Sequence, residues 1–201
     1  EAVAHAGIEF GKPRISLEKL RAWKAGVVGK LTKGLAGLAK QRKVQIVHGK
    51  GHFTSPHTLR VETAEGAKTI SFDYCVIAAG SSIARIPGFP YDDKRMIDST
   101  SALELPGVPK RLLVIGGGII GLEMATVYDA LGARISVVEL MDSLIPGADK
   151  DVVRPLAKRI EKRYEKILLK TKVARIEPQS SGLKVTYEGA NAPPPELFDA
   201  V

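Results

Sequence analysis

Residues 112–139 read LLVIGGGIIGLEMATVYDALGARISVVE, and they carry the clearest structural signal in the chain. An apolar run leads into a G-x-G-x-x-G turn formed by Gly116, Gly118 and Gly121. A segment of helical length follows, and a second apolar run ends at Glu139, 18 residues after Gly121. The order of strand, glycine turn, helix, strand and acid predicts a βαβ unit that binds a dinucleotide.

The chemistry of a dinucleotide accounts for each part of this pattern. Glycines let the backbone approach a pyrophosphate, and the N-terminus of the following helix offers it free N–H groups. An acid after the second strand accepts hydrogen bonds from ribose hydroxyls and repels a 2′-phosphate. Because residues 140–142 supply no Lys or Arg, we expect NAD rather than NADP. The alternative, a glycine turn that only allows packing, leaves Glu139 without a role.

Composition indicates an ordinary globular protein of one large or two small domains. The 201 residues are 44% hydrophobic and 26% charged, and no apolar run approaches the roughly 20 residues of a membrane helix. The only cysteine, Cys75, lies in an apolar run and is expected to be buried. No Cys/His cluster has the spacing of a metal site. Because the chain begins with Glu1 rather than Met, we expect its natural N-terminus to lie upstream.

The net charge of +8 comes entirely from the first part of the chain. Residues 1–70 hold 13 Lys or Arg and 5 Asp or Glu. Much of the excess lies in residues 16–43, where apolar residues recur at helical spacing after a possible N-cap at Ser16. A basic patch can indicate nucleic-acid binding, but no aromatic interleaving or groove-reading motif accompanies it. We therefore expect a solvated helix face near an anionic cofactor or an acidic protein partner.

Apolar runs and turn residues predict the remaining elements. In the first part, we expect a strand at 44–47, a tight turn at 49–51, an antiparallel meander from 58–63 and 69–72, and a buried strand at 74–79. In the last part, we expect a helix at 150–164 with a late start or kink at Pro155, a third parallel strand at 167–169, a hairpin from 173–177 and 183–187, and a strand beginning at 197–201.

Several further stretches resemble the dihydrolipoamide dehydrogenase family of flavoproteins, within the pyridine nucleotide-disulfide oxidoreductases. They are LAGLAK at 35–40, VIAAGS at 76–81, DST at 98–100, GGGIIGLEM at 116–124 and LIPGAD at 144–149. The resemblance covers nearly the whole chain. It implies an α/β, Rossmann-like FAD/NAD(P)-binding fold with a small antiparallel β-meander in each of two units. The corresponding domains are a partial FAD-binding domain at 1–82, a linker at 83–109, and an NAD-binding domain at 110–201 with a truncated last strand.

The resemblance also implies which residues hold the cofactors. For NAD, the pyrophosphate turn and helix start would contribute Gly116, Gly117, Gly118, Ile119, Ile120, Gly121 and Leu122. Glu139 would bind the adenosine ribose, Val173 would pack near the adenine, and Glu123 would lie close to where nicotinamide and flavin meet. For FAD, the implied contacts come from Gly51, Ala79, Gly80 and Ser81.

The implied activity is that of an enzyme that reoxidises protein-bound dihydrolipoamide with NAD⁺ through FAD and a redox-active disulfide. A homodimer in the cytoplasm, or in the mitochondrial matrix of a eukaryote, would act on the lipoyl domains of 2-oxo acid dehydrogenase complexes. The family's disulfide and its acid/base pair match no residue of this chain, so residues 1–201 hold no implied catalytic residue and are expected to be inactive alone. A related FAD-dependent disulfide reductase and a non-catalytic NAD-binding fragment remain alternatives.

Overall fold

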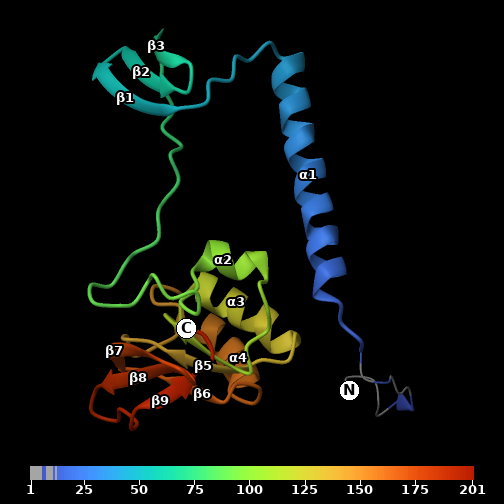
Figure 1. Ribbon diagram of the computed structural model, residues 1–201, viewed down its shortest axis with the longest axis vertical. Coiled ribbons are helices and arrows are strands. Elements are labelled where there is room, and N and C mark those ends of the chain that lie inside the picture. The colour runs from blue at the N-terminus through green and yellow to red at the C-terminus, as the bar shows by residue number, and fades with distance from the viewer. Residues whose placement is uncertain (1–5, 8–10, 12) are drawn as a thin grey trace. The chain divides into compact units, whose positions relative to one another are not determined.

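The computed structural model describes residues 6–7, 11 and 13–201, and the chain divides into two compact units (Figure 1). The first, which we call the N-terminal unit, comprises residues 19–82. The second, the C-terminal unit, comprises residues 83–201 together with the described residues before Lys19. Each unit has its own strands and is described by itself.

Helix α1, Leu17–Gln41, is the long amphipathic helix that the sequence predicts after Ser16. None of its residues is buried, and its apolar side chains Trp23, Leu31 and Leu35 are each about two-thirds exposed. Because these residues recur at helical spacing, they form an apolar stripe along the helix. The described residues of the N-terminal unit do not bury this stripe.

The sheet of the N-terminal unit consists of β1 (Lys50–Ser55), β2 (Thr58–Thr63) and β3 (Gly66–Ser71), paired antiparallel in that order. The predicted meander is confirmed and has one strand more than expected. The tight turn expected at 49–51 is wrong, because Gly51 lies within β1 opposite Val61. Pairing with β2 satisfies the backbone groups of this segment, which its sequence alone does not reveal.

Two other expected strands of this unit do not form. Residues 44–47 and 74–79 are irregular, and Tyr74 and Val76 are 95% and 90% exposed. Cys75, expected to be buried, is exposed as well. A strand needs a neighbour that accepts and donates its backbone hydrogen bonds. No described strand of the N-terminal unit pairs with either segment. Their apolar sequences alone are therefore not sufficient to form strands.

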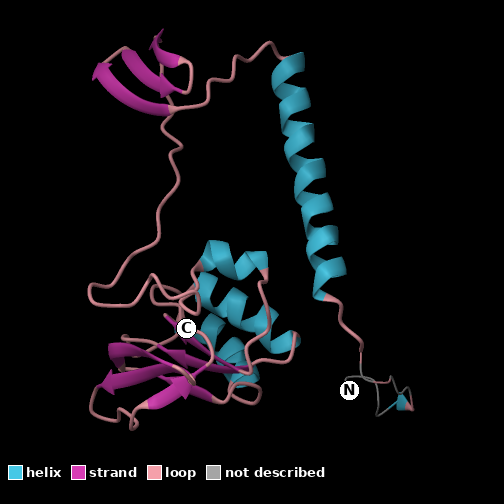
Figure 2. Cartoon of the chain, in the orientation of Figure 1, coloured by secondary structure: helices cyan, strands magenta, loops and turns pink. Residues whose placement is uncertain are grey.

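The C-terminal unit contains the predicted parallel sheet, with β4 (Arg111–Ile115), β5 (Arg134–Val138) and β6 (Lys166–Leu168) in that order. Helix α3 (Ile119–Ala130) connects β4 to β5, and α4 (Lys150–Ile160) connects β5 to β6. Figure 2 shows the helices of this unit gathered to one side of its strands. Helix α4 begins well before Pro155, so a late start, one of the two alternatives expected there, is wrong, and the helix ends at Ile160 rather than at 164.

A second sheet in the same unit is antiparallel and consists of β7 (Lys172–Gln179), β8 (Gly182–Glu188) and β9 (Glu196–Phe198). The predicted hairpin is thereby confirmed. The strand expected at 197–201 instead divides, because β9 ends at Phe198 and Ala200 then pairs in parallel with Leu112. An apolar core joins the two sheets and includes Leu113, Val138, Val173, Ile176, Leu183, Val185, Tyr187, Phe198 and Val201.

Residues 83–109 pack into the C-terminal unit in the structure. They contain the short helix α2 (Ser99–Glu104), whose N-cap Asp98 accepts a hydrogen bond of 2.8 Å from the backbone N–H of Ser101. Phe89 and Met96 pack against the apolar core. This segment therefore has tertiary contacts of its own, whereas the sequence suggests only a linker. The expected division into domains at 1–82, 83–109 and 110–201 stays a prediction.

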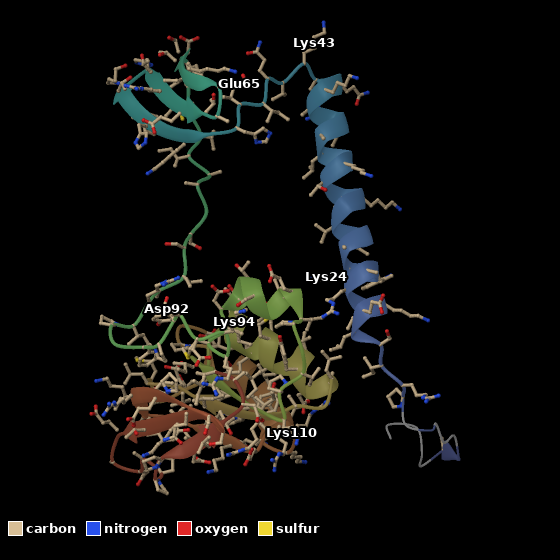
Figure 3. All side chains as sticks on the ribbon, in the orientation of Figure 1. Lys24, Lys43, Glu65, Asp92, Lys94 and Lys110 are labelled. Atoms are coloured by element: carbon tan, nitrogen blue, oxygen red, sulfur yellow. The ribbon has the colours of Figure 1, made fainter. Side chains whose placement is uncertain are left out.

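Arg95 connects the same segment to the second sheet. The Arg95 guanidinium binds the Asp93 carboxylate at 2.7 Å and donates a hydrogen bond of 2.8 Å to the carbonyl oxygen of Gln179. The hydrogen bond from Arg95 lowers the pKa of Asp93 to about 2. The neighbouring side chains of Asp92 and Lys94 are exposed and are labelled in Figure 3.

Arg111 joins the two sheets through a network of charged hydrogen bonds. Its guanidinium donates to the carboxylates of Glu165 and Glu196, both at 2.9 Å, and lies 4.6 Å from the centre of the Phe198 ring. Burial acts to raise the pKa of Glu196, but hydrogen bonds from Lys166 and Arg111 outweigh it and hold this pKa below its ordinary value. Glu196 thus stabilises the fold in its charged form.

We predict that Arg111→Met destabilises the protein by about 2 kcal/mol at neutral pH, because Glu165 and Glu196 lose their shared partner. Chemical denaturation measures the free energy of unfolding. The matched control is Arg134→Met, which removes an exposed arginine from the facing position of β5. Because folding lowers the pKa of Glu196, the stability that this carboxylate contributes is lost as the pH falls. The difference in unfolding free energy between wild type and Arg111→Met should therefore become smaller in acid. Equal unfolding free energies of Arg111→Met and Arg134→Met would contradict a stabilising role of the Arg111 network.

Candidate functional site

The glycine turn lies between the end of β4 and the start of α3. Its first residue, Gly116, donates a backbone hydrogen bond of 2.8 Å to the carbonyl oxygen of Val138 and so continues the parallel sheet. Gly118 is the N-cap of α3, and no side chain caps the helix. The first hydrogen bond of the helix runs from Leu122 back to Gly118 at 3.1 Å. The N–H groups of residues 118–121 therefore lack intrahelical acceptors and form the positive end of the helix dipole.

Two glycines of the turn have different reasons to lack a side chain. A Cβ on Gly121 would collide with the carbonyl oxygen of Gly116 and come within 3.1 Å of Val114 Cγ1, so Gly121 is required for the helix to pack on the strand. A Cβ on Gly118 would meet no protein atom within 4 Å. The space in front of Gly118 is therefore open, as an approaching anionic ligand would require.

Glu139 lies against this turn, as the sequence predicts, and its side chain is buried, with the residue only 8% exposed. Its Oε2 accepts a hydrogen bond of 2.8 Å from the backbone N–H of Gly117, and its Oε1 accepts one of 2.7 Å from Met141. These two bonds were not expected from the sequence. A carboxylate has about four lone-pair sites, so acceptor capacity remains for ribose hydroxyls.

The loop after Glu139 also contacts the turn, a contact that the sequence does not predict. The backbone N–H of Ile145 donates a hydrogen bond of 2.8 Å to the carbonyl oxygen of Gly117, and the Leu144 side chain is buried beside it. The available signal was the stretch LIPGAD at 144–149, whose Pro and Gly indicate a tight turn.

The structure brings some of the expected NAD residues together and gives others different surroundings. Ile119 and Ile120, in the first turn of α3, are 62% and 60% exposed, and Glu123 is exposed on the same helix. Leu122 is buried against the sheet and has a packing role. Val173 is buried in the apolar core between the two sheets. Contact of Val173 with adenine stays a prediction.

The expected FAD residues belong to the N-terminal unit. Gly51 lies within β1, where a Cβ would come 3.3 Å from Leu59 Cδ2, so its glycine also has a packing reason. Ala79, Gly80 and Ser81 are exposed in an irregular segment, with Gly80 at a φ of +68°. Their contact with FAD stays a prediction.

An apolar cavity of about 310 Å³ also adjoins the first turn of α3. Its walls include Ile115 from β4, Val201 after β9, Met124 from α3, and Phe89 and Tyr91 from the segment before α2. Such walls offer few donors to phosphate groups. This cavity therefore suits an apolar group better than a phosphate, and the polar turn at Gly118 is the candidate anion site.

The described residues form neither a metal-binding cluster nor a membrane-spanning helix. No group of three or more His, Cys, Asp or Glu side chains there is arranged to hold a metal ion. Within the same part of the chain, no helix combines the length and the hydropathy that spanning a membrane requires.

Comparisons with known proteins show the family of the chain. The model of the pyridine nucleotide-disulphide oxidoreductase family matches residues 2–194, and the chain belongs to this family. It is 49% identical to the dihydrolipoyl dehydrogenase of Vibrio cholerae, over the whole chain and 42% of that protein. The dihydrolipoyl dehydrogenase of Haemophilus influenzae is also 49% identical, over the whole chain and 43% of that protein.

Solved structures show the same fold. The HOCl-induced flavoprotein disulfide reductase RclA from Escherichia coli matches with a TM-score of 0.75 and 26% identity, over 90% of this chain and 41% of that one. The α/β, Rossmann-like fold expected from the sequence is therefore confirmed. The chain spans less than half the length of the relatives that it matches.

We predict that Gly118→Val abolishes detectable NADH binding without unfolding the protein. The new side chain would extend into space that the protein leaves open and that the pyrophosphate needs. Fluorescence titration with NADH and a thermal melt measure the two properties. Gly107→Val is the matched control, because a Cβ there also meets no atom within 4 Å. NADH affinity that survives in Gly118→Val would show that the nucleotide does not bind at this turn.

Proposed function

We propose that the protein is an NAD-dependent dihydrolipoyl dehydrogenase, a flavoprotein that oxidises protein-bound dihydrolipoamide. The observation that carries the proposal is the buried Glu139 carboxylate, bonded to Gly117 beside the uncapped start of α3. This pairing of an acid with helix N–H groups suits a ribose and a pyrophosphate together. The Vibrio and Haemophilus relatives, each 49% identical, are named dihydrolipoyl dehydrogenases, and these names indicate dihydrolipoamide as the substrate.

In this proposal, the C-terminal unit holds NAD. The backbone N–H groups of residues 118–121 bind the pyrophosphate, and Glu139 accepts hydrogen bonds from the adenosine ribose. Glu123, exposed on α3, lies toward the nicotinamide, while Val173 supports the adenine side. When bound, the nucleotide supplies the hydride-accepting chemistry, and the protein supplies binding and orientation.

The N-terminal unit contributes to FAD binding in the same proposal. Residues 79–81 are exposed, so their backbone groups are accessible to a ligand, and Gly51 lies in the sheet of the same unit. The intact protein would act as a homodimer on lipoyl domains, in the cytoplasm or, in a eukaryote, in the mitochondrial matrix. The basic residues of α1 would then serve an anionic cofactor or acidic partner rather than nucleic acid.

The activity is tested with the full-length protein. Reduction of NAD⁺ at 340 nm is followed with dihydrolipoamide as the substrate, and the visible spectrum reports bound flavin. We expect a flavin spectrum and dihydrolipoamide-dependent NADH formation. A flavin spectrum with turnover of a different dithiol or disulfide would overturn the substrate assignment. Absence of both signals would overturn the proposed function.

We predict that the protein prefers NAD to NADP because a 2′-phosphate would face the Glu139 carboxylate. In Glu139→Ser, the repulsion is removed, but the bonds to Gly117 and Met141 are lost as well. Catalytic efficiency with NAD should therefore fall roughly tenfold or more, while the NAD/NADP ratio moves toward one. Steady-state kinetics with both nucleotides measures the ratio. Equal efficiencies in the wild-type protein would contradict the assignment of Glu139.

A further inference from the structure

We propose that Leu144 and Ile145 are positioning residues that preset the glycine turn for the dinucleotide, and we call this pair the Leu144–Ile145 clamp. The inference rests on the proposed binding of NAD at the turn and extends it to a loop that contributes no group to the expected site. Both residues follow Glu139 on the same connection, between β5 and α4.

The first observation is that both polar backbone groups of Gly117 are held. Its N–H donates to Glu139 Oε2, and its carbonyl oxygen accepts from the Ile145 N–H, both at 2.8 Å. The carbonyl of Gly117 and the N–H of Gly118 belong to one planar trans peptide group and point in opposite directions. Fixing the carbonyl with Ile145 therefore fixes the direction of the Gly118 N–H, the first of the donors available to a pyrophosphate.

The second observation is a close side-chain fit. Leu144 is 4% exposed, and a Cβ on Gly117 would come 2.6 Å from Leu144 Cδ2 and 3.2 Å from Glu139 Cβ. The backbone of Gly117 is not in the left-handed region, so its conformation alone does not require glycine. Gly117 is small because Leu144 occupies the adjacent space, which couples the loop directly to the turn.

The third observation is backbone strain in the loop. Ile145 has a φ of +47°, a left-handed conformation that is costly for a β-branched residue. Such strain persists where the surrounding contacts demand it, and it gathers at ligand sites. The N–H of Ala148 donates to the Ile145 carbonyl at 3.1 Å and closes the turn from its other side. The strained conformation aims the Ile145 N–H at Gly117.

The loop is itself anchored, so it can act as a support. Met141 donates its N–H to Glu139 Oε1 at 2.7 Å, and its carbonyl oxygen accepts a hydrogen bond of 2.9 Å from Lys170. Glu139 therefore binds the N–H of Gly117, and the clamp binds its carbonyl oxygen. Binding a cofactor to such a prearranged turn loses less conformational entropy than ordering it on contact.

A double-mutant cycle in the full-length protein tests the clamp. The variants are Gly117→Ala, Leu144→Ala and the double variant, and the measurement is the dissociation constant for NADH. Each single change should raise this constant roughly tenfold, because the turn is displaced or loosened. In the double variant, the Leu144 atom that crowds the new methyl group is gone. The double variant should therefore bind NADH more tightly than Gly117→Ala, which independent structural defects would not produce.

Controls separate positioning from general damage. Leu140→Ala trims an exposed leucine of the same loop and should leave NADH affinity unchanged, while Leu144→Met should restore most of the affinity lost in Leu144→Ala. If Leu144→Ala does not fold, Leu144→Val removes the same crowding atom and completes the cycle. The proposed clamp would be overturned by additive losses of NADH affinity in the double variant. It would also be overturned by wild-type NADH affinity in Leu144→Ala. If the wild-type protein fails to bind NADH, it is the proposed function that fails.

Discussion

The hydrogen bond between the Gly117 N–H and the Glu139 carboxylate joins the two strand ends on which the site depends. It is possible because β4 and β5 are parallel, with Ile115 opposite Val138, so that both chains leave the sheet at the same edge. The turn after one strand and the acid after the next then meet, although 22 residues separate them. This is the general reason that ligands bind at the carboxyl ends of parallel strands. A different register would separate the donors from the acid.

The second sheet and residues 83–109 stabilise this arrangement. The apolar core joins the antiparallel strands to Leu113 and Val138, so the parallel sheet is covered on the face that its helices leave open. Arg111 and Arg95 add charged hydrogen bonds at the margins of that core. Parallel strands require cover on both faces. The stability of the site thus rests on residues that contribute no group to it.

The N-terminal unit illustrates how far apolar sequence can mislead. Residues 74–79 have the composition of a buried strand, yet Tyr74 and Val76 are almost fully exposed. The apolar spacing of α1 predicts its structure correctly, because a helix satisfies its backbone hydrogen bonds within itself. A strand obtains its hydrogen bonds from another segment, so its prediction also assumes an unseen neighbour. That difference explains why the helix was confirmed and the two strands were not.

The βαβ unit, the glycine turn, the hairpin and the presence of an acid at the turn could be predicted from the sequence, since these follow from local periodicity and spacing. The three-dimensional structure was needed to show that both oxygens of Glu139 bind backbone N–H groups and that Val173 is buried. It also revealed Ile145 in a strained conformation against Gly117. Those features depend on where a loop returns and which backbone groups it meets. Such contacts between distant segments leave no periodic signal along the chain.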